Sequence, residues 1–157
     1  MTEFDAARDR RIEAAERWCK RVRQYRFAVE REEEACRALR ERMDGIGAVR
    51  YDREGGRTYV AHGDDAMARA VASLNAARQR HEDAIVQCEA ERKEFDAAIS
   101  NITPLYASLL TYRYEMCMSW PQVAEQPDIS MTEDYVRGDL RRKALAELYP
   151  FLPPGWK

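Results

Sequence analysis

A group of basic residues near the C-terminal end is the part of this sequence best suited to a chemical role. Arg137 and Arg141 are four positions apart, which places them on one face of a helix, and Arg142 follows directly. Basic side chains on one face can contact nucleic-acid phosphates, because counterion release supplies much of the binding affinity. Glu133 and Asp134 precede them, where carboxylates favour a helix N-terminus and could accept from a cytosine amino group. The spacing is compatible with a contact to double-stranded DNA.

The charge balance leaves a second interpretation open. Six basic residues face seven acidic ones between Ser100 and Lys157, and the whole chain carries a net charge of −2. This part could equally be a protein-interaction domain with a solvated charged face. A basic stretch at 17–26 and an acidic run at 30–34 lie further upstream. Their complementarity favours pairing between copies of the chain, although a solvated helix face would show the same pattern.

No group of residues has the spacing of a catalytic or cofactor site. Gly55 and Gly56 lack the Lys and Ser/Thr companions of a phosphate-binding loop. His62 and His81 have no helix-spaced acidic or cysteine partners of the kind that bind zinc. We therefore expect no enzyme activity, cofactor, metal or small-molecule substrate. We expect buried free thiols at the four cysteines, which are Cys19, Cys36, Cys88 and Cys117.

The residues that could do chemistry must be positioned by helices. Charged residues make up 34% of the chain, against only 7 Gly and 6 Pro. Residues 2–44 contain neither Gly nor Pro, and their apolar residues recur mostly at steps of three and four, which predicts a long amphipathic helix. The expected buried stripe consists of Ile12, Ala15, Cys19, Val22, Tyr25, Val29, Cys36, Leu39 and Met43.

A second long helix is expected to begin at a cap formed by Asp64 or Asp65 and to run to residue 103. Two such helices predict an all-α architecture with a long antiparallel helical hairpin, or coiled coil, over residues 1–103. Gly45 and Gly47 are expected to end the first helix, and the tip at 45–63 then forms a small β-hairpin or an ordered loop, of which we favour the hairpin. The second buried stripe consists of Met67, Val71, Leu74, His81, Ile85, Cys88, Phe95, Ile99 and Ile102.

Residues 104–157 predict a small domain of three short helices. Pro104 opens the first helix, which ends near Cys117, and Ser119 caps the second. Pro127 forces a turn because it cannot continue a helix. Ser130 and Glu133 then match a capping box that starts the third helix, before the proline-rich tail packs against the domain. The expected inner side of this helix consists of Val136, Leu140, Ala144, Leu145 and Leu148.

Several short motifs resemble a known pattern. In chain order they are Arg113-Tyr114, 119–124 (SWPQVA), Ser130 and Ala144-Leu145. They are similar to the sigma-factor region 4 type of helix-turn-helix found in small phage and prophage regulators, including uncharacterised prophage families. The resemblance covers about 109–148, a quarter of the chain. Its motifs are short and of moderate specificity. It implies a C-terminal three-helix, helix-turn-helix domain over 104–157.

The resemblance also implies roles for individual residues. In this family pattern the helix that begins near Ser130 reads the major groove, and Trp120, Val123 and Ala124 form the core of the helix before it. This sequence departs from the pattern at Pro127-Asp128 in the turn and at Cys117, which stands where the family tends to have a glycine. The spacing from Ser130 to Ala144-Leu145 is also longer than usual by two or three residues. The implied groove-facing residues are Thr132, Glu133, Asp134 and Arg137, and the implied phosphate-facing residues are Arg141, Arg142 and Lys143.

The function implied is a phage or prophage DNA-binding transcriptional regulator, often a late-gene activator. A dimer or other homo-oligomer formed through the coiled coil would set the spacing of two reading heads, and RNA polymerase is an alternative partner of a sigma-like module. The alternative function is a packaging, assembly or other coiled-coil interaction protein without sequence-specific DNA binding. The acidic start, residues 1–5, and the absence of an apolar run of about 20 residues predict a cytoplasmic protein with no membrane partner.

Overall fold

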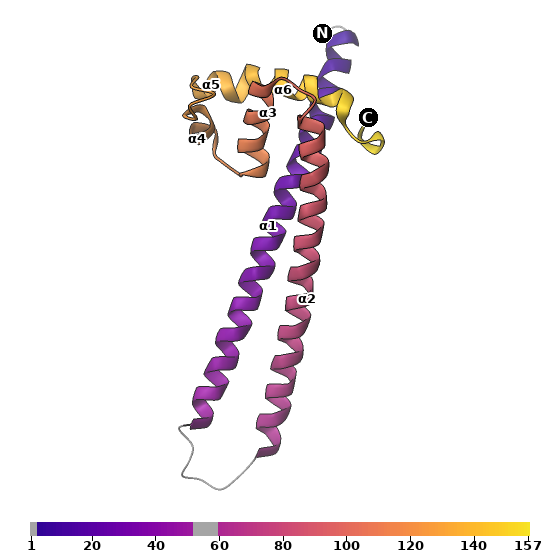
Figure 1. The fold of residues 1–157 in the computed structure, drawn as a ribbon. Coiled ribbons are helices and arrows are strands. Elements are labelled where there is room, and N and C mark those ends of the chain that lie inside the picture. The colour runs from indigo at the N-terminus through magenta and orange to yellow at the C-terminus, as the bar shows by residue number, and fades with distance from the viewer. Residues whose placement is uncertain (1–2, 52–59) are drawn as a thin grey trace. The chain divides into compact units, whose positions relative to one another are not determined.

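The structure is a computed structural model that describes the backbone of residues 3–51 and 60–157, and side chains within those ranges except 46–51 and 60–64. Every secondary-structure element of these ranges is helical, so the expected all-α class is confirmed. Two long helices come first, α1 (Glu3–Tyr51) and α2 (Val60–Ile99), and short helices follow them (Figure 1).

Packing divides the chain into two compact units. Unit 1 comprises residues 1–26 together with 88–157, and unit 2 comprises residues 27–87. Both long helices contribute to both units, because unit 1 takes the start of α1 and the end of α2. These units are not the same as the expected domains 1–103 and 104–157, and that domain boundary stays a prediction.

The core of unit 1 joins the start of α1, the end of α2 and the short helices. The rings of Trp18 and Phe95 stack with their centroids 5.8 Å apart, and one turn further along α1 Arg21 Nη2 donates to Glu91 Oε1 at 2.9 Å. Since the second pair lies later on α1 but earlier on α2, the two helices run antiparallel within this unit. Burying each large apolar side chain here stabilises the fold by about 2 kcal/mol.

The apolar periodicity of the sequence predicts much of this core. The expected stripe members Ile12, Ala15, Cys19 and Val22 of α1 are all buried. Trp18 is only 2% exposed although the stripe did not include it. A tryptophan next to a stripe can turn its large ring into the core, because the apolar face of a buried helix is wider than a narrow coiled-coil seam.

Unit 2 has a thinner core. Cys36, Leu74 and Ala77 are buried, and Arg80 Nε donates to Glu32 Oε2 at 3.3 Å. Other members of the two expected stripes are only half-buried here, and Val71 is exposed. The heptad-like pattern is therefore buried less completely in unit 2 than in unit 1.

The ends of the long helices differ from the sequence expectation. Helix α1 continues past Gly45 to Tyr51, so the prediction that glycines end it at this point is wrong. A glycine inside a helix costs about 1 kcal/mol relative to alanine, but it retains its amide and breaks no hydrogen bond. The cap expected at Asp64 or Asp65 is also wrong, because α2 already begins at Val60. The expected β-hairpin or loop centres on residues 52–59, which lie outside the described residues, and its outer parts at 49–51 and 60–61 are helical.

The first short helices follow the pattern of caps and breakers. Helix α3 (Pro104–Leu110) begins with its proline and continues directly as the π-helix η1 (Thr111–Glu115). Helix α4 (Trp120–Ala124) has Ser119 at its N-cap, as expected, and the Ser119 amide donates to Gln122 Oε1 at 2.9 Å. The turn expected around Pro127 follows α4 and is confirmed.

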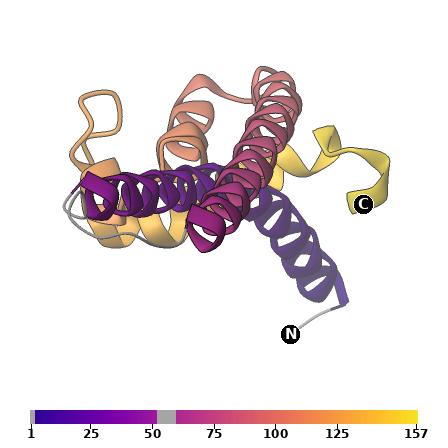
Figure 2. The ribbon, with the colours of Figure 1, turned by 90° about the horizontal axis from the view of Figure 1, so that it is seen from below.

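The last long element is the 133–148 helix, which consists of α5 (Glu133–Tyr135), the π-helix η2 (Val136–Leu140) and α6 (Arg141–Leu148) in succession. All five residues expected on its inner side are buried, because their spacing places them on the face toward the core. In unit 1, α4 and the C-terminal tail lie at opposite ends of this helix (Figure 1, Figure 2). The tail forms two 3-10 turns, η3 (Tyr149–Phe151) and η4 (Pro154–Trp156), and buries Leu152 in the core.

Candidate nucleic-acid interface

The start of the 133–148 helix is set by Thr132 and not by Ser130. Thr132 has the extended backbone of an N-cap residue, with φ −67° and ψ 144°, and the helix begins at Glu133. Ser130 has a left-handed φ of 45°, and its amide donates to Gln126 O at 2.8 Å. An N-cap residue needs extended backbone angles, so the expected Ser130 capping box is wrong. The helix starts three residues after Ser130.

The residues expected to face a DNA groove lie together at the first two turns of this helix. Thr132, Glu133, Asp134 and Arg137 are all exposed, while Val136 between them is fully buried. The burial of Val136 fixes which side of the helix faces the core and leaves the other side to solvent. Two carboxylates and one guanidinium therefore share the exposed surface.

Two of the expected phosphate contacts have carboxylate partners in the same chain. Arg141 Nη1 donates to Glu16 Oε1 at 2.6 Å, and Arg142 Nη2 donates to Asp9 Oδ1 at 2.6 Å. Asp9 and Glu16 lie two turns apart on α1, so α6 crosses this acidic face of α1 (Figure 1). The Arg142 pair is solvent-accessible, with side chains 52% and 45% exposed, whereas the Arg141 side chain is 28% exposed.

Lys143, the third expected phosphate contact, lies against Tyr135. Its Nζ is 5.7 Å from the centre of the tyrosine ring and 3.5 Å from the tyrosine hydroxyl. Both residues are exposed, so the ammonium group remains accessible to an anion. The seven expected residues thus form one exposed group at 132–137 and a second group at 141–143 whose charges are partly satisfied.

Arg113 is a basic residue of this region to which the sequence assigned no role. It is half-buried in η1, where its Nη1 donates to Met118 O at 2.7 Å and its guanidinium lies 4.6 Å from the centre of the Trp120 ring. Burial lowers the pKa of the Arg113 guanidinium, and the positive charges of Arg23 and Arg141 lower it further. The Arg-Tyr pair followed by Ser-Trp was the only local feature that could have drawn attention to Arg113. The neighbouring arginines on α1 and α6 are distant in sequence, so no local pattern could reveal them.

The turn before α4 contains a residue with a strained backbone conformation. Cys117 has a left-handed φ of 57°, a conformation that glycine adopts without a steric penalty. Its half-buried Sγ lies 3.8 Å from Tyr114 O. Glycine would therefore fit this backbone position without strain.

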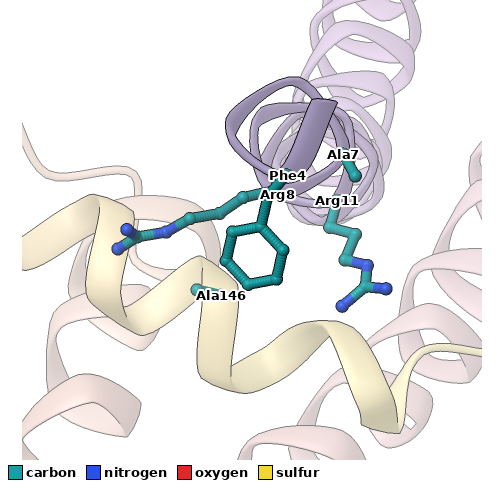
Figure 3. Close-up of a pocket in the computed structure, with 5 residues that line it drawn as sticks. All are labelled: Phe4, Ala7, Arg8, Arg11 and Ala146. Atoms are coloured by element: carbon teal, nitrogen blue, oxygen red, sulfur yellow. The ribbon is translucent and has the colours of Figure 1, made fainter. Parts of the chain in front are cut away.

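A shallow cavity of about 160 Å³ lies between the start of α1 and Ala146, in the second half of α6. In Figure 3 the ring of Phe4 points toward Ala146 of α6, with Arg8 and Arg11 on either side. Phe4 remains 80% exposed, so the cavity is an open depression and not an enclosed site. Its two guanidiniums add positive charge to unit 1, but it has no group that could act as a nucleophile or general base.

The cysteines are free thiols, as expected, but only two are buried. Cys19 and Cys36 are buried, whereas Cys88 and Cys117 are half-buried. Burial raises the pKa of the Cys19 thiol far above its usual range, which keeps it protonated and unreactive. In the part of the chain that the structure describes, no three acidic, cysteine or histidine side chains gather as a metal site would require. Within residues 3–51 and 60–157, no helix is both long and apolar enough to cross a bilayer.

Comparison of the chain with protein-family models, with curated proteins and with solved structures finds no match. Its functional assignment therefore depends on the residues and geometry described above.

Proposed function

We propose that this protein is a phage or prophage DNA-binding transcriptional regulator that reads double-stranded DNA with the start of the 133–148 helix. The observation that carries the proposal is the exposure of Thr132, Glu133, Asp134 and Arg137 on a helix whose other side is buried. In a helix-turn-helix, the N-terminal residues of the second helix contact base edges, while the helix before it supports them. Helix α4 and the turn after it precede the 133–148 helix in the order that this motif requires.

The polar groups at this surface suit base recognition better than strong electrostatic attraction. Arg137 can donate to the acceptor atoms of guanine, and Glu133 or Asp134 can accept from a cytosine amino group. We expect Lys143 and Arg142 to contact phosphates. Arg142 pairs with Asp9, but this pair is exposed, so a phosphate can replace the carboxylate. The net charge of the region predicts weak binding, and so few phosphate contacts predict only a shallow dependence on salt.

Exposed apolar side chains in unit 2 support the proposal of a homo-oligomer. Phe27 and Val86 are 46% and 67% exposed, and Val71 is 40% exposed. Association of two copies through these side chains would bury them and would present two reading helices to two half-sites. Light scattering of the purified chain tests this part of the proposal, and a monomeric mass at high concentration would contradict it.

Binding of fluorescent duplexes tests the DNA proposal. The wild-type chain is titrated into duplexes from the region upstream of its own gene and into shuffled duplexes, at two salt concentrations. We expect preference for one duplex, and a loss of about tenfold in its affinity for Arg137→Ala, which corresponds to about 1.4 kcal/mol. Arg78→Ala removes an exposed arginine of unit 2 and is the matched control, which should bind as the wild type does. No binding at low salt would contradict the proposal.

A second candidate is a packaging, assembly or other interaction protein without sequence-specific DNA binding. The pairing of Arg141 and Arg142 with carboxylates favours it, because fewer positive charges remain for phosphates. This candidate predicts stable oligomers and equal, weak affinity for all duplexes, so the same titration distinguishes the two.

A further inference from the structure

One face of α1 points toward η1 and α6 and carries an acidic residue followed by two basic ones. Glu16 on this face accepts from Arg141 Nη1 at 2.6 Å, and Arg26 Nη1 donates to Glu115 O at 2.7 Å. Arg23 lies seven residues after Glu16 and three before Arg26, so it shares their face of the helix. The two contacts therefore place Arg23 between α6 and the end of η1.

Arg113 of η1 lies in the same region and is held by uncharged groups. Met118 O accepts from its Nη1 at 2.7 Å, and the Trp120 ring lies under its guanidinium. The positive charges of Arg23 and Arg141 are close enough to help lower the Arg113 pKa, after the larger effect of burial. The contacts of Glu16 with α6 and of Arg26 with η1, together with this electrostatic effect, place three guanidiniums from α1, η1 and α6 in one region, even though like charges repel one another.

Glu16, an acidic residue of this region, contacts two cations. Glu16 Oε1 contacts both Arg141, at 2.6 Å, and Lys20, at 3.3 Å. Arg141 also has a buried Nε atom with no hydrogen-bond partner in the protein. A buried donor without an acceptor is destabilising, and an added anion would both accept from it and offset the repulsion between the arginines.

We propose that Arg23, Arg113 and Arg141 form a binding site for a phosphate group. Planar guanidiniums present paired donors that match the oxygens of phosphate, and several of them around one site favour an anion of high charge density. The ligand is either free inorganic phosphate or a phosphodiester of a nucleic-acid backbone. The site does not depend on base recognition by the 133–148 helix.

Titration of the full chain with inorganic phosphate tests the site. Phosphate binding is followed by calorimetry and by the thermal unfolding midpoint, against sodium chloride at matched ionic strength. We expect saturable binding of phosphate and none of chloride. Arg23→Gln should weaken phosphate binding at least tenfold, and Glu16→Gln should strengthen it several-fold because it removes the competing carboxylate. Arg8→Gln, which changes an exposed arginine elsewhere on α1, is the control and should leave phosphate binding unchanged.

Two results would overturn the proposal: a phosphate response no larger than that of chloride, or equal phosphate affinity in the wild type and Arg23→Gln. Circular dichroism of each variant without phosphate verifies that it is folded. The opposite effect expected for Glu16→Gln keeps the test valid even if Arg23→Gln unfolds.

A second arm with duplex DNA distinguishes the two sources of phosphate. Competition of inorganic phosphate with duplex DNA, together with weaker DNA binding by Arg23→Gln, assigns the site to the nucleic-acid backbone. Unchanged DNA binding by Arg23→Gln assigns it to free phosphate. If phosphate binds but no duplex does, the phosphate site holds and the proposed regulator function fails.

Discussion

Arg142 of α6 donates a hydrogen bond to Asp9 of α1 at 2.6 Å, and the side chains of both residues remain about half exposed. An ion pair of this kind contributes at most about 1 kcal/mol to stability, because water screens it and two flexible side chains must be ordered. A DNA phosphate can therefore replace the carboxylate at little cost to the fold. In the free protein, Asp9 of α1 therefore competes with DNA phosphates for the guanidinium of Arg142.

Removing this competitor should strengthen DNA binding. We expect Asp9→Asn to increase the affinity for duplex DNA several-fold at low salt, and to steepen the dependence of log K on log salt by about 0.9 for one added phosphate contact. The unfolding midpoint should change little. Fluorescence anisotropy at four salt concentrations measures both quantities. Glu41→Gln removes an exposed carboxylate of α1 in unit 2 and is the control for net charge. An unchanged salt slope in Asp9→Asn would show that Arg142 does not reach a phosphate.

Local signals in the sequence predict most of the short helices. Pro104 begins a helix and Ser119 caps one, because each acts on backbone groups within one turn of itself. Ser130 and Thr132 are both good capping residues, however, and the sequence does not distinguish them. The choice depends on Ile129, which is buried and whose amide donates to Gln126 O at 3.0 Å, so that the turn continues through Ser130.

The backbone of Cys117 provides a test of a different turn, the one before α4. A side chain in the left-handed region carries a steric penalty that glycine lacks, so we expect Cys117→Gly to stabilise the protein by about 0.5–1 kcal/mol in urea unfolding. Cys117→Ala keeps a Cβ atom and is the matched control, which should give no gain. Equal stability of the two variants would mean that the left-handed backbone does not limit stability here.

The candidate site depends on contacts between residues far apart in the sequence. The pairing of Arg141 with Glu16, and the convergence of Arg113 with Arg23, join α1 to helices about a hundred residues later in the chain. Helical periodicity gives the face on which a residue lies, but not which other helix covers that face. The sequence could therefore predict the basic face of the 133–148 helix without predicting the carboxylates that occupy part of it.

The carboxyl group of Asp96 predicts a pH dependence. Partial desolvation raises the pKa of this exposed side chain, and the negative charge of Glu115 raises it further. The folded protein therefore binds this proton more tightly than the unfolded chain, so stability increases as the pH falls from above the raised folded pKa toward the unfolded value near 4. Above that window the ionised carboxylate is destabilising.

We expect Asp96→Asn to raise the urea midpoint at pH 7, and the difference from the wild type to shrink as the pH falls toward about 4. Urea unfolding at pH 4, 5, 6 and 7 measures this dependence. Glu94→Gln, which changes an exposed carboxylate two residues away, controls for the loss of one charge. A midpoint lower than that of the wild type at pH 7 would contradict the assigned direction of the Asp96 shift.

A substitution at Gly138 can test separately the stability of the 133–148 helix and its role in DNA binding. It lies in η2, its φ is not positive, and a Cβ atom built on it would meet nothing within 4 Å. Alanine should therefore stabilise the helix by about 0.5–1 kcal/mol, because it loses less backbone freedom on folding. Gly45→Ala in unit 2 meets the same conditions, should give a similar gain and has no expected role in DNA binding. If DNA approaches the backbone of η2 closely, Gly138→Ala will bind duplex DNA more weakly than the wild type while Gly45→Ala will not. Equal DNA affinities of the two variants would place the DNA away from this turn of the helix.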